Sequence, residues 1–297
     1  MTKRQWDILI GLFTLAILTG FAWVIAPIAK TQPLRFGVLV LVGLGFGYMV
    51  WRGRTATRRA KRQATEKPFP VGYRRILRER VDFYQRLSPS EKERFERKVQ
   101  WFLADTDITG VGTEVDDLSR VLVAASAVIP IFGFDDWHYG NVDEVLLYPG
   151  SFDSHTFAQE GEGRNTLGMV GTGAMGRKVI LSKPAVINGF LRQADGHNTG
   201  IHEFVHLLDA SDGSYDGLPA LLDKKYVTPW MGMMYREMKK IEHGKSILRE
   251  YGATNKVEFF AVASELFFER PERMRTSHPK LYDLLTKLFQ VPSGKRA

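Results

Sequence analysis

Two apolar segments near the N-terminus constrain this chain more than any other feature of its sequence. Residues 8–29 run for 22 positions without a charge, and a helix of that length can cross the roughly 30 Å hydrocarbon core of a bilayer. A second apolar run covers residues 36–51, and the flanking Arg35 and Arg52 can extend it by snorkelling to the interface. The sequence therefore predicts a transmembrane helical hairpin over residues 1–52.

The basic residues are concentrated beside these segments. Residues 1–67 contain 11 of the 41 Lys and Arg and only 2 of the 33 Asp and Glu, so the remainder of the chain is nearly balanced. This distribution favours an anionic lipid surface over direct nucleic acid binding. Basic residues flank both spans on the side of the termini, whereas the loop between the spans has two. We therefore expect the inner (cytoplasmic) membrane, with two spans and the large domain on the cytoplasmic side.

A cleaved signal peptide is the competing interpretation of the first apolar run. Ala26 and Ala29 loosely resemble a cleavage site. The run is longer than a typical signal-peptide core, however, and a second apolar run follows at once. These features favour a membrane hairpin.

Downstream of the hairpin, the sequence predicts a basic linker over residues 53–72 and an α+β domain over residues 73–297. A capping box with proline at the first helical position, Ser88-Pro89-Ser90-Glu91, marks the start of one helix. The pattern is mainly helical with a small sheet. We expect helices at 89–104, 114–129 (ending before Pro130) and 256–268, and strands at 144–148 and 177–182.

The chemistry is concentrated in an H-E-x-x-H motif at residues 202–206. Histidines four positions apart project from one face of a helix, so His202 and His206 can reach the same Zn²⁺. Glu203 lies beside them, where it can take a proton from zinc-bound water and later deliver it to a leaving amine. Since the chain has no cysteine, a zinc site must use histidine and carboxylate ligands.

Three carboxylates are candidates for the third ligand. Asp212 lies six residues after His206, but sites with this spacing need glycine where this chain has Asp209. Glu258 and Glu265 lie seven residues apart on one face of a predicted helix, so one can bind the metal while the other supports a ligand. We favour Glu258, because the small Ala261 lets its helix approach the histidine helix closely.

At this point the sequence resembles the Mlc titration factor A family of zinc-dependent peptidases, which are of the gluzincin type. The resemblance covers roughly residues 100–290, nearly the whole predicted soluble domain. It rests on four segments: His202–Asp209, Tyr251–Glu265, the stretch from Ile108 to Ala127, and Val179–Ser182.

The resemblance implies His202, His206 and Glu258 as zinc ligands and Glu203 as the base. It also implies that Tyr251 donates to the oxyanion and that Glu265 supports a ligand. The family fold is an α+β zincin in which a substrate strand adds to a sheet edge, and Lys178–Ser182 is the expected edge strand. The family is associated with aminopeptidase activity on peptide substrates and with binding a sugar-responsive transcriptional repressor.

The chain departs from the family pattern in its N-terminal hairpin and at Lys183, where many members have tryptophan. The hairpin means that the repressor partner does not carry over directly from the family, and Lys183 bears on the substrate preference. The alternative function, from another class, is a membrane-tethered binding protein that sequesters a transcriptional regulator, with a vestigial or structural zinc site. Asp209 is a candidate to orient a ligand imidazole, or else a solvated acid at a helix end. The glycine-rich stretch 161–176 is expected to be a long loop or a flap, and the remaining five histidines are expected to be surface or capping residues.

Overall fold

The computed structural model describes residues 66–291 except 136, 160–162, 172–174, 192–195 and 219–220, together with Gly43, Gly45, Gly47 and Tyr48. The chain divides into two units, Met1–Arg59 and Ala60–Ala297. No helix among the described residues is long and apolar enough to cross a membrane. Apart from the four residues just named, the predicted spans at 8–29 and 36–51 lie outside the described residues, so the hairpin stays a prediction.

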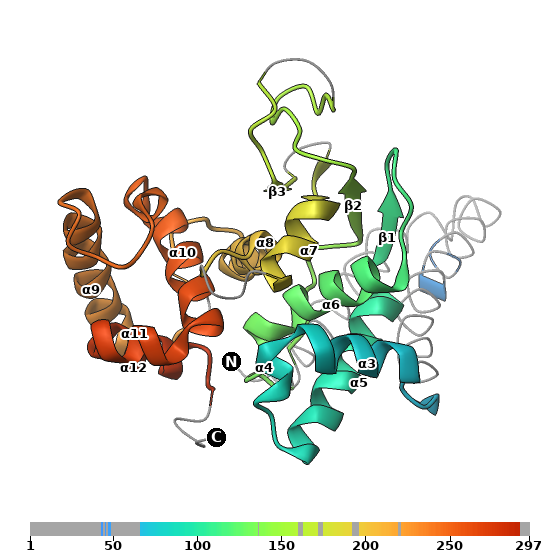
Figure 1. Cartoon of the computed structure of the whole chain (residues 1–297), viewed down its shortest axis with the longest axis horizontal. Coiled ribbons are helices and arrows are strands. Elements are labelled where there is room, and N and C mark those ends of the chain that lie inside the picture. The colour runs from blue at the N-terminus through green and yellow to red at the C-terminus, as the bar shows by residue number, and fades with distance from the viewer. Residues whose placement is uncertain are drawn as a thin grey trace, which may run out of the picture. The chain divides into compact units, whose positions relative to one another are not determined.

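Helices dominate the second unit, and a four-stranded sheet lies among them (Figure 1). The α-helices are α3 (Val71–Arg80), α4 (Asp82–Gln85), α5 (Pro89–Asp105), α6 (Asp117–Ile131), α7 (Lys183–Leu191), α8 (Thr199–Asp209), α9 (Lys224–Glu242), α10 (Lys256–Glu269), α11 (Pro271–Ser277) and α12 (Pro279–Leu288). The strands are β1 (Asp107–Gly110), β2 (Glu144–Tyr148), β3 (Gly168–Val170) and β4 (Lys178–Ser182), and short 3-10 helices are η2 (Ala210–Asp212) and η3 (Glu250–Ala253). The expectation of a mainly helical α+β domain is confirmed for this unit.

The strand order corrects the predicted sheet edge. The order is β1-β2-β4-β3, in which β1, β2 and β4 are parallel and β3 is antiparallel to β4. β4 is therefore an interior strand, and β3 from the glycine-rich stretch lies beside it. Lys178 does not mark an exposed edge, because its ammonium lies 2.5 Å from the Glu144 carboxylate on neighbouring β2.

Local capping fixes where the helices begin. The capping box at α5 is present, with Glu91 N donating to Ser88 Oγ and Ser88 N donating to Glu91 Oε2. α6 begins at Asp117, three residues later than predicted, because Asp116 Oδ1 accepts a hydrogen bond from Ser119 N at 2.7 Å. α6 also continues one residue past Pro130, within the usual uncertainty of a helix end.

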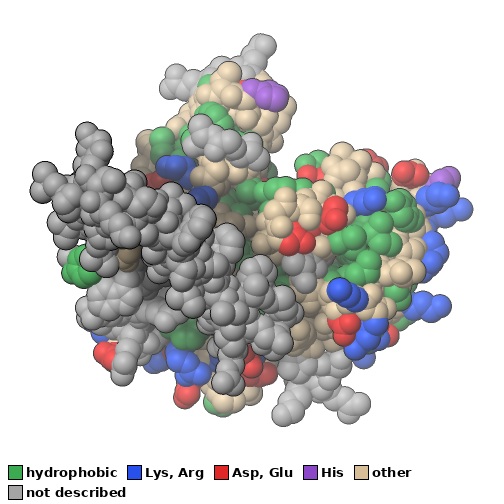
Figure 2. Space-filling model, turned by 180° about the vertical axis from the view of Figure 1, so that it is seen from behind, with side chains coloured by type: hydrophobic (Ala, Val, Ile, Leu, Met, Phe, Trp, Pro, Cys, Tyr) green, Lys and Arg blue, Asp and Glu red, His purple; other side chains and the backbone are tan. Residues whose placement is uncertain are grey.

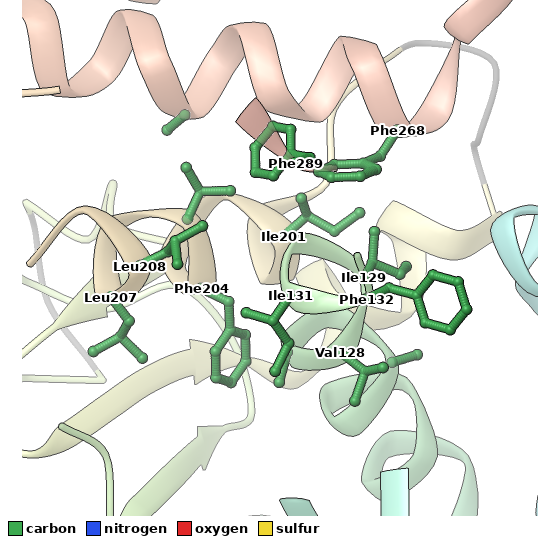
Figure 3. Close-up of a cluster of buried hydrophobic side chains, with 14 of the residues drawn as sticks. Val128, Ile129, Ile131, Phe132, Ile201, Phe204, Leu207, Leu208, Phe268 and Phe289 are labelled. Carbon is green, nitrogen blue, oxygen red and sulfur yellow. The ribbon is translucent and has the colours of Figure 1, made fainter. Parts of the chain in front are cut away.

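Helix α8 is buried along its whole length. Its residues are all buried, and it contacts α6, α7, α10 and β3. Figure 3 shows Ile201 of α8 between Ile129 of α6 and the rings of Phe268 and Phe289. Apolar side chains of this size each contribute about 1.5–3 kcal/mol when fully buried, so packing against several neighbours holds α8 in one orientation.

The charges on the surface agree with the nearly balanced composition of residues 68–297. Figure 2 shows Lys and Arg interspersed with Asp and Glu over the C-terminal helices. His278 stands at a capping position, as expected, because α11 ends and α12 begins there, but its side chain makes no capping hydrogen bond and does not lie at the surface. It is buried, and its Nδ1 lies 3.0 Å from Oε2 of the buried Glu237.

Gly200 allows α8 to pack closely against α6. A Cβ added at Gly200 would lie 2.2 Å from Ser126 Oγ and 2.8 Å from Ser126 Cβ. In a helix interior, glycine is up to about 1 kcal/mol less favourable than alanine. The glycine at position 200 therefore lowers the intrinsic stability of α8 but allows α8 and α6 to approach closely.

We predict that Gly200→Ala destabilises the protein by about 1–3 kcal/mol, despite the better helix propensity of alanine. Urea denaturation followed by circular dichroism measures the change. Gly72→Ala is the matched control, because a Cβ there meets nothing within 4 Å. Adding Ser126→Gly to Gly200→Ala should restore stability, since it removes both clashing atoms. An unchanged or raised stability of the single Gly200→Ala variant would refute the packing argument.

Candidate metal centre

His202 and His206 lie one turn apart on the same face of α8. Their rings are perpendicular, with centroids 4.6 Å apart, and both side chains are buried. Both Nε2 atoms face one carboxylate oxygen of Glu258, at 3.0 Å from His202 and 3.5 Å from His206. The structure therefore brings together the three residues that the resemblance implies as ligands.

Glu258 comes from the first turn of α10. Asn255 caps this helix by accepting a hydrogen bond from Glu258 N at 3.0 Å, which fixes the start of the turn. Although burial raises the pKa of Glu258, its hydrogen bonds to the two imidazoles outweigh burial and lower that pKa well below its usual value. Glu258 is therefore an ionised carboxylate that faces both histidines and can act as a metal ligand.

The spacing of these donors fits a small metal ion. His202, His206 and Glu258 each offer one ligand atom within 4.8 Å of the others. Ligands about 2.1 Å from a tetrahedral ion lie about 3.4 Å from one another, close to the 3.0 and 3.5 Å found between Glu258 and the imidazoles. Two imidazoles and one carboxylate leave a fourth position for water or substrate.

Glu265 contacts the His202 imidazole at Nδ1, the ring nitrogen that does not face Glu258. Its Oε1 lies 2.8 Å from His202 Nδ1, and the Glu265 side chain is fully buried. Asn198 N and Arg249 Nη2 also donate to this carboxylate, at 2.6 and 2.5 Å. Burial raises the pKa of Glu265, but the His202 hydrogen bond and the Arg249 charge outweigh it and lower the pKa.

The contacts of Glu258 and Glu265 determine the direction of the pKa shift of His202. Burial lowers the pKa of His202, but the hydrogen bonds to Glu258 and Glu265 outweigh it and raise the pKa to about 10. The Glu265 acceptor at Nδ1 keeps the proton on that nitrogen when the ring is neutral. Nε2 then carries the free lone pair and is the nitrogen that can bind a metal ion.

Asp209 does not make the contact suggested by its position. Its Oδ2 accepts a hydrogen bond from Gly217 N at 3.0 Å, and the side chain is fully buried rather than solvated. Asp209 Oδ1 and His206 Nδ1 are both buried and have no hydrogen-bond partner among the residues that the structure describes. Asp209 therefore fixes the loop after α8, and burial raises its pKa to about 6.

Among the described residues, Asp212 does not belong to the group of possible metal ligands formed by His202, His206 and Glu258. Its Oδ1 accepts hydrogen bonds from Ser214 N and Ser214 Oγ, at 3.0 and 2.7 Å. This carboxylate therefore stabilises the turn that follows α8.

Glu203 lies against β3 and interacts electrostatically with His202, His206 and Glu258. It is buried, and burial raises the pKa of its carboxyl group. A Cβ added at Gly168 would lie only 2.6 Å from Glu203 Cγ. Only glycine at this position lets the β3 backbone approach the acid so closely. The glycine-rich composition of the segment was the available signal, although the sequence predicted a loop there.

Tyr251 borders the site from η3. Its ring is half-exposed and lies 5.9 Å from the His202 ring, centroid to centroid. Partial burial, the charge of Glu258 and a hydrogen bond to Glu258 raise the pKa of Tyr251 to about 12. The phenol therefore stays protonated and can donate a hydrogen bond.

Two further residues at this site were missed by the sequence reasoning. Arg249 holds Glu265, as described above. Tyr215 is half-exposed, and burial together with the charges of Asp209 and Glu203 raises its pKa. Neither belongs to a motif, so no sequence signal was available for them beyond their proximity to Tyr251 and Asp209.

Comparisons with known proteins show which sequences this chain is similar to. The chain is 28% identical over 273 residues to an uncharacterized protein of Synechocystis, covering 89% of this chain and 96% of that relative. It is 26% identical over 222 residues to Mlc titration factor A of Klebsiella pneumoniae, covering 69% and 80%. It is also 26% identical over 227 residues to Mlc titration factor A of Salmonella agona, covering 71% and 83%.

The sequence profile of one family spans the whole of the helical unit and its sheet. The profile of the glucose-regulated metallo-peptidase M90 family matches residues 55–290, a range that contains the donor group, Glu203 and Tyr251. This chain therefore belongs to the glucose-regulated metallo-peptidase M90 family.

Proposed function

We propose that this protein is a zinc-dependent peptidase that hydrolyses peptide bonds, with a peptide or a protein as its substrate. The observation that carries the proposal is the convergence of two imidazoles and one carboxylate beside the buried Glu203. Membership of a metallopeptidase family supports it. Stepwise removal of N-terminal residues, as in an aminopeptidase, is the mode of cleavage that we propose.

His202, His206 and Glu258 are the residues that would hold the ion. Nitrogen and carboxylate donors in a three-ligand set suit catalytic zinc. When bound, zinc would lower the pKa of a coordinated water and polarise the carbonyl of the substrate. Glu265 would keep the His202 ring in place through its 2.8 Å contact with Nδ1.

The protein itself would supply the proton transfers. Glu203 would accept a proton from the attacking water as its oxygen adds to the carbonyl carbon. The same carboxyl group would then give this proton to the amine nitrogen as the C–N bond breaks. Tyr251 would donate a hydrogen bond from its phenolic O–H to the developing oxyanion, because the phenol stays protonated beside the site.

A second candidate function is a binding protein that sequesters a transcriptional regulator and keeps the site as a vestige. The name of two of the relatives, Mlc titration factor A, supports a regulator as a partner. A buried Glu203 and a half-exposed Tyr251 beside the donors favour catalysis, because a purely structural site needs neither. The cleavage experiment below separates the two functions.

We also propose that residues 8–29 and 36–51 anchor the protein in the inner membrane, with the peptidase domain on the cytoplasmic side. The distribution of basic residues around the apolar runs supports this orientation. A membrane anchor would restrict the peptidase to substrates that reach the cytoplasmic face.

We predict that Glu258→Gln strongly depletes bound zinc, whereas Glu265→Gln weakens affinity only about 10–100-fold. Glu258 would bind the ion directly, but Glu265 acts through His202. Elemental analysis and titration against a chelator measure both effects. Glu272→Gln is the matched control, because the Glu272 side chain is 77% exposed. A reversed order of the two variants would identify Glu265 as the ligand.

We predict that Glu203→Gln keeps zinc at one ion per chain but lowers hydrolysis by about 10²–10⁴-fold. Mass spectrometry of a diverse peptide mixture incubated with the full chain in detergent measures the products. Loss of N-terminal residues with the wild type alone establishes an aminopeptidase, and internal cuts establish an endopeptidase. Full activity in the Glu203→Gln variant would reject the mechanism. Zinc-loaded wild type without any cleavage would favour the binding function.

The membrane topology can be tested with introduced cysteines, because the chain has none of its own. We predict that an impermeant maleimide labels Gln32→Cys in intact spheroplasts, but labels Ser277→Cys only after permeabilisation. Labelling of Ser277→Cys in intact spheroplasts would reverse the proposed orientation. Recovery of both variants in the soluble fraction would refute the anchor.

A further inference from the structure

A cavity of about 310 Å³ reaches the first turn of α8, the helix that carries His202, Glu203 and His206. It is bounded by the ends of β3 and β4, by α7 and by the first turn of α8, which lie close together in Figure 1. We call it the α7 pocket, because Pro184, Ala185 and Asn188 on one side of α7 line it. Leu167 and Thr199 are the lining residues through which the pocket adjoins Glu203, the proposed base.

The α7 pocket adjoins the proposed base directly. Thr199 lies one helical turn before Glu203 on α8. Thr199 Cγ2 and Glu203 Oε1 both lie within 2.8 Å of one point, the position that a Cβ would take on Gly168. Leu167, which precedes Gly168, also lines the pocket. A peptide with its scissile bond at Glu203 therefore has an adjacent side chain within reach of the pocket.

The pocket is open to a side chain that arrives from solvent. Leu167 is 38% exposed, and both Pro184 and Asn188 are exposed at the surface of α7. The volume of about 310 Å³ is at the lower end of the range for small-molecule binding sites. It is therefore large enough for one large side chain, including an aromatic ring.

The lining determines which side chains fit. The described lining residues include no Asp, Glu, Lys or Arg, so a charged side chain would lose hydration without gaining an ionic partner. Hydroxyl and amide groups of Ser151, Asn188 and Thr199 offer hydrogen bonds to a polar end. The one titratable lining residue, His197, interacts electrostatically with Glu265.

We propose that the α7 pocket binds a large uncharged side chain, such as that of Gln, Met, Phe or Tyr, next to the scissile bond of the substrate. This specificity rests on the proposed peptidase function. It assigns to Ala185 and Asn188 a role in selecting the substrate, at positions that belong to no motif.

The test uses the full-length, zinc-loaded Glu203→Gln protein, so that binding is measured without turnover. The probes are labelled pentaalanine peptides in which one position at a time carries Gln, Tyr, Glu or Lys. At one position, Tyr and Gln should bind at least 10-fold more tightly than Ala, whereas Glu and Lys should not. Fluorescence anisotropy measures the affinities.

Two kinds of substitution in this background then identify the pocket. Ala185→Trp should fill it and lower the affinities for the Tyr and Gln peptides to that of pentaalanine, which abolishes the preference. Leu191→Trp, at a 51% exposed position of α7 outside the pocket, is the matched control and should keep the preference. Asn188→Lys should shift the preference at that position to Glu, and Asn188→Asp should shift it to Lys.

The outcomes separate this inference from the proposed function. If the wild type cleaves peptides but Ala185→Trp leaves the side-chain preference unchanged, the pocket proposal is wrong and the peptidase stands. If binding shows the Ala185-dependent preference but the wild type cleaves nothing, the pocket still binds a large uncharged side chain, but its place beside a scissile bond falls together with the peptidase proposal. A preference for Glu or Lys before any substitution, or no peptide binding at all, would also overturn the pocket proposal.

Discussion

The buried carboxylate of Glu265 is the interaction on which the rest of the site depends. It joins three elements, because it accepts from Asn198 before α8, from Arg249 before η3 and from His202 on α8 itself. An unpaired charge in such a place costs several kcal/mol, so these contacts stabilise one another. The same contacts that satisfy the carboxylate also orient the His202 ring and place Tyr251 at the edge of the site.

The two imidazoles are held unequally. His202 has a buried carboxylate behind it, whereas His206 Nδ1 has no hydrogen-bond partner among the described residues. Asp209, one turn after His206, accepts a hydrogen bond from the Gly217 backbone and so secures the following loop. His206 therefore depends for its orientation on packing within α8 and on Glu258, whose carboxylate lies 3.5 Å away.

Close backbone approach is the second constraint. Glycine at 200 lets α8 reach α6, and glycine at 168 lets β3 pass over Glu203. Gly168 brings β3, Glu203 and Thr199 of the α7 pocket lining close together, whereas Gly200 holds α8 against α6. A side chain at either glycine would separate elements that the proposed chemistry requires in contact, so the packing and the function constrain the same positions.

The sequence by itself determined what depends on local spacing: the two imidazoles on one helical face, the capping box of α5, strand β2, and the family. The tertiary structure decided what depends on distances between elements. The sequence favoured Glu258 over Glu265 through the small Ala261. The Asn255 cap and the packing of α10 on α8 then directed Glu258 at both histidines. The tertiary structure also made β3 the neighbour of β4 and brought Arg249 to Glu265. Residues within one helix keep a fixed geometry, whereas contacts between helices follow from packing that no local pattern records.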